Sequence, residues 1–197
     1  MADGNYYLES SLIDRVTTSA AAHDEAKSLV ALINGILLTR GTAYDPVTLG
    51  SVVIELDEDG TEKNHVVLGA AALRARSKLH AIAVTSGGMD MVPARPESAR
   101  FLDLAMTDPD VNDALRLWGS HPHDWITLYK IFEIMGRPVF PDRARFTHTA
   151  NHPAASGDAS RHGRMNQQPP SKPMVLHEAR AAIGSLLELW LRSKLPS

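Results

Sequence analysis

The pattern of apolar positions changes from helical to alternating in the first third of the chain. Residues 19–38 carry apolar side chains near every third or fourth position, among Ala, Glu and Lys residues that favour helix. Residues 49–56 and 63–69 are rich in β-branched residues and flank the turn sequence DEDG. The pattern predicts a long first helix followed by an antiparallel hairpin.

A helical pattern returns near residue 98. Residues 98–106 form one periodic stretch, after which Asp108 can cap a second helix that has Pro109 in its first turn. A third helix is predicted after the sequence HPHD, with Asp124 favourable at its N-terminus. One face of this helix collects Trp125, Leu128, Tyr129, Phe132 and Met135.

The clearest helical pattern lies at the C-terminal end. It is bounded by Pro173, which can begin a helix, and by Pro196, which ends it. Its apolar stripe consists of Leu176, Ala179, Ile183, Leu186, Leu187 and Trp190. We interpret this stripe and the preceding one as core positions rather than as chemistry.

Two segments between the hairpin and the later helices bear on domain organisation. Residues 73–84 alternate small or apolar positions with basic ones, which suits a strand, although their composition also favours helix; their basic row is either a solvated face or a phosphate-binding one. Residues 86–97 contain two glycines and two prolines and are interpreted as a linker. We therefore predict an α+β protein, with a helix and a small antiparallel β-meander in residues 1–92 and a helical bundle in residues 93–197.

Composition excludes several classes of site. With 197 residues and 44% hydrophobic content, the chain can bury a core without covalent cross-links. It has no cysteine, so disulfides, thiolate metal sites and cysteine nucleophiles are excluded. No basic and apolar leader is present at the start, and no run approaches the length of a membrane span. We expect a soluble, cytoplasmic protein without cofactor or membrane partner.

The net charge of −3 is distributed unevenly. Residues 137–172 hold six Lys or Arg against two Asp, so this window carries +4 and the rest of the chain −7. A basic island in an acidic chain indicates an anionic ligand, although a solvated loop gives the same pattern.

Histidines and arginines gather in the sequence RFTHTANHPAASGDASRHGR, between the last two long helices. If its first part is helical, Arg145 and His152 lie two turns apart on one face with His148 between them. Arg161 and His162 form a second pair, which could fold back over the first. Guanidinium groups bind phosphate, and imidazole can transfer a proton near neutral pH.

Residues 122–195 resemble the HEPN superfamily of helical domains. The resemblance is carried by DWITLYKIFEIM, by the Arg–His spacing in RFTHTANH, by RHG and by the closing helix PMVLHEARAAIGSLLELWL. Two positions depart from the family pattern, because the residue after the motif arginine is Phe146 rather than a polar one, and because Pro153 follows His152.

The resemblance implies an RNA-cleaving or RNA-binding protein with a toxin or phage-defence role. A ribonuclease of this family would be a homodimer that works without metal: a ribose 2′-oxygen attacks the adjacent phosphodiester, with a histidine assisting proton transfer. An antitoxin or other protein partner is also implied. The catalytic candidates are Arg145, His152, Arg161 and His162, and either histidine can be the family's. The substrate-binding candidates are Asn151, His148, Arg143 and Arg164.

Three alternatives stay open at this point. The helical part can be a non-catalytic dimerisation or interaction module of a larger complex. His148 and His152 also have a spacing known for zinc, which His162, Asp158 or the HPHD sequence could complete. Finally, the arginines and histidines can simply cap and solvate a loop, or pair with acids from the N-terminal half of the protein. Ion pairs of that kind would argue against a nuclease.

Overall fold

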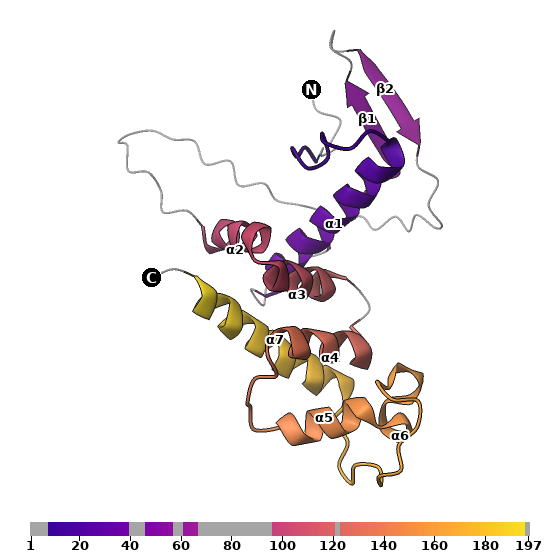
Figure 1. Ribbon diagram of the computed structural model, residues 1–197, viewed down its shortest axis with the longest axis vertical. Helices are drawn as coiled ribbons and strands as arrows, with labels where there is room; N and C mark the ends of the chain where they lie inside the picture. Colours follow the sequence, from indigo (N-terminus) through magenta and orange to yellow (C-terminus); the bar gives the residue numbers. More distant parts are fainter. Residues whose placement is uncertain (1–7, 40–45, 57–60, 67–95, 121–122, 196–197) are drawn as a thin grey trace. The chain divides into compact units, whose positions relative to one another are not determined.

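The computed structural model describes residues 8–39, 46–56, 61–66, 96–120 and 123–195 (Figure 1). Its contacts divide the chain into two compact units. The hairpin unit comprises Met1–Val30 and Asp45–Ala94, and the helical unit comprises Ala31–Tyr44 and Arg95–Ser197. Both helices and an antiparallel sheet are present, so the broad α+β class is confirmed, while the domain limits of 1–92 and 93–197 stay a prediction.

The hairpin unit contains the sheet and the first half of helix α1, Ser19–Leu38. Strands β1 (Val52–Leu56) and β2 (Glu62–Val66) pair antiparallel, in a register that places Ile54 opposite Asn64. The predicted helix and hairpin are therefore confirmed. The expected meander needs a further strand in residues 73–84, which lie outside the described residues, as does most of the linker.

The helical unit follows the predicted order of helices closely. Asp108 caps the second of them by accepting hydrogen bonds from the N–H groups of Asp110 and Val111. Asp124 caps the next by accepting from Thr127 N–H at 2.7 Å. The elements are α2 (Glu97–Thr107), α3 (Pro109–Gly119), α4 (Trp125–Ile134), α5 (Arg143–Asn151), α6 (Pro153–Ser156), a 3-10 turn (Gly157–Ala159) and α7 (Leu176–Lys194).

One apolar core holds these helices together. The five positions predicted on one face of α4 are all buried, and α4 packs against α3, α5 and α7. On α7 the buried line is Ala179, Ile183, Leu187 and Leu191, whereas Leu176, Leu186 and Trp190 are only partly buried. The six positions of the predicted stripe are thus all buried or packed against the core, and Leu191, one turn beyond Leu187, extends it.

Helix α5 is fixed in this core by one aromatic side chain. Phe146 is fully buried, and its ring centroid lies 5.3 Å from that of Phe132 and 6.0 Å from that of Tyr129, both on α4. Since Phe146 faces α4, the neighbouring polar positions of α5 face elsewhere. This orientation determines where the candidate arginine and histidines lie.

Candidate functional site

The first Arg–His group lies on one face of helix α5, as predicted. Arg145, His148 and Thr149 belong to the helix, and His152 is its C-terminal cap. All four side chains form hydrogen bonds with the chain between Gln167 and Met174, which we call the covering segment. The face is therefore in contact with the protein's own backbone.

Arg145 joins the covering segment to the start of α7. Its Nε donates to the carbonyl of Lys172 at 3.2 Å, and its Nη2 donates to the carbonyl of Pro173 at 3.1 Å. The same Nη2 forms an ion pair of 2.7 Å with Glu178 Oε2. The structure thus gives Arg145 three acceptors from the chain itself, including a carboxylate that lies 33 residues further on.

The two histidines hold the other end of the covering segment. His148 Nε2 lies 3.0 Å from the carbonyl oxygen of Gln168, and His152 Nε2 lies 3.0 Å from that of Gln167. A carbonyl accepts only, so both Nε2 atoms carry the proton in these bonds. His152 Nδ1 in turn accepts from Ala154 N–H at 3.1 Å, which caps α6. Both ring nitrogens of this buried histidine are thereby occupied.

Thr149 belongs to this arrangement and was missed by the sequence analysis. Its side chain is fully buried, donates to the carbonyl of Arg145 at 2.8 Å and accepts from Met174 N–H at 2.9 Å. The available signal was its helical spacing, four residues after Arg145 and three before His152.

The second pair lies against a different helix. The backbone N–H of Arg161 donates to the carbonyl of Ala150 at 3.0 Å, which brings it to the end of α5. Its guanidinium, however, lies over the ring of Tyr129 on α4, 4.7 Å from the centroid, and pairs with Glu133 at 3.2 Å. The His162 side chain is exposed. The structure brings Arg145, His148 and His152 together and places Arg161 separately.

The remaining candidates are dispersed. Arg143 is half-buried, with its guanidinium carbon 6.0 Å from the centroid of the Phe132 ring, and Arg164 is exposed. The Oδ1 atom of Asn151 is buried without a hydrogen-bond partner, and its backbone carbonyl accepts from Ser160 Oγ at 3.0 Å.

Neither a metal site nor a membrane span is found in the described part of the chain. No three His, Asp or Glu side chains there come together as metal ligands. The rings of His148 and His152 are 6.1 Å apart, but their Nε2 atoms bond to different carbonyls. No helix within the described ranges has both the length and the apolar character needed to cross a bilayer.

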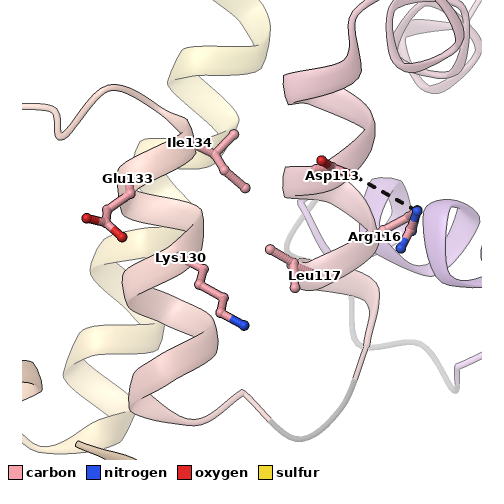
Figure 2. A pocket seen from close by; sticks show the side chains of 6 residues that line it. All are labelled: Asp113, Arg116, Leu117, Lys130, Glu133 and Ile134. Carbon is pink, nitrogen blue, oxygen red and sulfur yellow. Dashed lines mark ion pairs between the residues drawn. The ribbon is translucent and has the colours of Figure 1, made fainter. Parts of the chain in front are cut away.

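A shallow groove between α3 and α4 is a second candidate (Figure 2). Its volume is about 370 Å³. Leu117 and Ile134 point towards it, whereas the carboxylate of Glu133 points away from α3. The lining residues are Asp113, Arg116, Leu117, Lys130, Glu133 and Ile134. Two acids balance two bases, and Asp113 pairs with Arg116 at 3.9 Å, so the groove offers no excess charge to an ionic ligand.

Comparison of the chain with protein-family models, with curated proteins and with solved structures returns no match.

Acid is expected to loosen the covering segment through Glu178. The N–H of Val175, at 3.2 Å from Oε2, and the charge of Arg145 hold the pKa of Glu178 below the ordinary glutamate value of 4.5. A lowered pKa means that the ionised carboxylate stabilises the fold above pH 4.5 and that this contribution is lost as the pH falls through the folded pKa. Amide hydrogen exchange of residues 167–174 should therefore accelerate as the pH falls through the lowered pKa of Glu178, beyond the intrinsic pH effect.

A local measurement is needed because Asp108 titrates in the same direction. Its hydrogen bond with Lys194 lowers its pKa, so acid also weakens the contact between the start of α3 and the end of α7. Glu178→Gln is the matched variant: its covering segment should exchange faster at neutral pH and lose the additional change on acidification. Equal pH dependence in wild type and variant would show that the Glu178 pair does not hold the segment.

Proposed function

We propose that this chain is a HEPN-like helical module that binds RNA through its basic region, residues 137–172, without cleaving it. The observation that carries this proposal is that the side chains of Arg145, His148 and His152 already form hydrogen bonds with backbone carbonyls, and that Arg145 also pairs with Glu178. A nuclease needs these groups directed at a phosphodiester and a ribose oxygen. Here they form hydrogen bonds with the carbonyls of the proline-containing covering segment.

The basic region still presents positive charge to solvent. His162, Arg164 and Lys172 are exposed, and the side chain of Arg161 is 39% exposed. Residues 137–172 carry a net charge of +4. Counting Glu133 and Glu178, which lie outside this range but pair with its arginines, lowers the net charge to +2. The surplus supports contact with an anionic chain, and the HEPN resemblance supports RNA, a homodimer, and a toxin or defence role.

The test is binding and cleavage in one sample. Full-length protein with a labelled single-stranded RNA should show binding that weakens on the order of tenfold between 50 and 200 mM salt, as expected for about three phosphate contacts. The RNA should remain intact with and without a chelator. Absence of binding at the lower salt concentration would refute the proposal.

Cleavage is a second candidate function, favoured by the exposed imidazole of His162 next to Arg161. It predicts chelator-resistant products that end in a cyclic phosphate. His162→Ala is the clean test, because this side chain lies outside the core, whereas His152→Ala would also remove the cap of α6. Products from wild type that disappear in His162→Ala, with unchanged unfolding, would establish the ribonuclease.

A further inference from the structure

The C-terminal end of α4 carries two guanidinium groups on one carboxylate oxygen. Glu133 Oε1 accepts from Arg137 Nη2 at 2.6 Å and lies 3.2 Å from Arg161 Nη2. One negative charge therefore faces two positive charges, and one positive charge remains uncompensated within this group. All three side chains are partly exposed, so the group is open to a ligand.

The backbone at Arg137 is one that glycine would fit better. Its φ is +56°, in the left-handed region, directly after Gly136 at +79°. Its N–H donates to the carbonyl of Phe132 at 2.9 Å, which closes the end of α4. Glycine would make the same bond without the steric cost of a side chain in this region. The backbone thus gives no reason for arginine at this position, whereas its guanidinium forms the ion pair with Glu133.

Aromatic rings of α4 position the neighbouring cations. The guanidinium carbon of Arg161 lies over the ring of Tyr129, 4.7 Å from its centroid, and that of Arg143 lies 6.0 Å from the centroid of the Phe132 ring. A guanidinium that uses its face on a ring still has N–H groups at its edge for an oxygen ligand. Arg161 is therefore held in place without using all its donors.

Another cluster of ion pairs in the helical unit has the opposite balance of charges. Arg192 pairs with Glu97 at 3.2 Å and with Glu188 at 2.9 Å, so one cation faces two acids. Both clusters join arginine to a glutamate that lies on a helix. Of these two clusters, the one at Glu133 has charge to offer an anion, which makes Arg192 a matched control.

We propose that Arg137 and Arg161 form a phosphate-binding site for the RNA backbone, in which Glu133 is the internal counter-ion that a phosphodiester displaces. Arginine binds phosphate through paired N–H donors, and a carboxylate held between two such groups competes for the same donors. This proposal rests on the proposed RNA-binding function and names the residues that contact the phosphates. A purely structural role for Arg137 at the end of α4 is the competing interpretation.

Arg137→Gly separates the two interpretations. The variant should keep or raise the unfolding temperature, because glycine favours positive φ, while its RNA affinity falls several-fold. The slope of log K against log salt should decrease by about 0.7, the value for one phosphate contact with a single strand. Glu133→Gln should change affinity in the opposite direction, with several-fold tighter binding, because the competing charge is removed. Arg192→Ala should leave the salt slope unchanged.

The outcomes distinguish this proposal from the proposed function. If wild type does not bind RNA, both fail. If wild type binds and Arg137→Gly binds equally well with the same salt slope, the site is refuted while RNA binding stands. Weaker binding by Glu133→Gln, with unfolding unchanged, would also refute the counter-ion role, since a displaced carboxylate can only oppose the ligand.

Discussion

Phe146→Ala is expected to lower the free energy of unfolding by about 3 to 5 kcal/mol, the usual cost of truncating a fully buried phenylalanine. The ring lies between four other aromatic side chains, those of Trp125, Tyr129, Phe132 and Phe140, with centroids at 5.3 to 6.2 Å. Alanine would leave a cavity between α4 and α5. Urea unfolding followed by circular dichroism measures the loss.

Thr147→Ala is the control for this variant. It changes the next residue of the same helix, whose hydroxyl bonds only locally, to the carbonyl of Ala144. Its expected effect is within about 0.5 kcal/mol, as for most surface substitutions. A loss below about 1 kcal/mol for Phe146→Ala would mean that the aromatic cluster does not anchor α5.

Phe146 also links the fold to the candidate site. In the HEPN pattern the position after the motif arginine is usually polar, whereas here it is the residue that attaches α5 to α4. With Phe146 directed at α4, Arg145 and His152 are directed at the covering segment. This difference from the HEPN pattern thus coincides with arginine and histidine being used to hold the chain together.

Local features of the sequence were enough to predict most elements of the helical unit. The caps at Asp108 and Asp124 depend on side chains and N–H groups within three residues of each other, and the apolar stripe of α4 depends on one helical period. Short-range patterns of this kind can be read without knowing the tertiary structure. The hairpin was predictable for the same reason, because DEDG connects adjacent strands.

The partners of the candidate site residues were not predictable in this way. Helical spacing placed Arg145, His148 and His152 on one face, but it says nothing about what covers that face. The covering groups are mainly backbone carbonyls, which every residue has and which leave no mark in the sequence. The acids that pair with the arginines, Glu133 and Glu178, lie on α4 and α7, not in the N-terminal half where they were sought.

The close packing of two glycines could not be predicted from the sequence pattern either. Gly35 of α1 and Gly119 at the end of α3 belong to the same helical unit and allow the two backbones to approach closely. A Cβ atom at Gly119 would overlap the carbonyl oxygen of Ala31 and lie 2.6 Å from the nitrogen of Gly35. Glycine at the end of a helix is common for conformational reasons, so its sequence position alone does not reveal a contact.

Gly119→Ala is therefore expected to destabilise the helical unit strongly, by about 3 kcal/mol, at the upper end of the cost of overpacking. The atoms in the way belong to backbone, so relief requires α1 and α3 to separate rather than one side chain to turn. Thermal and urea unfolding, followed by far-ultraviolet circular dichroism, measure the change. Leu115 and the core around it should lose hydrogen-exchange protection together with the end of α1.

Gly184→Ala is the matched control, because it makes the same chemical change in α7. There the new Cβ would meet only the ring of Trp118, at 3.0 Å, and a side chain can shift by the few tenths of an ångström required. The helix propensity of alanine offsets this adjustment by up to about 1 kcal/mol, so we expect a small net effect. If Gly119→Ala lowered the stability no more than Gly184→Ala, the inference that α1 and α3 approach closely would be wrong. A large difference between the two would show that backbone contact sets the spacing of these helices.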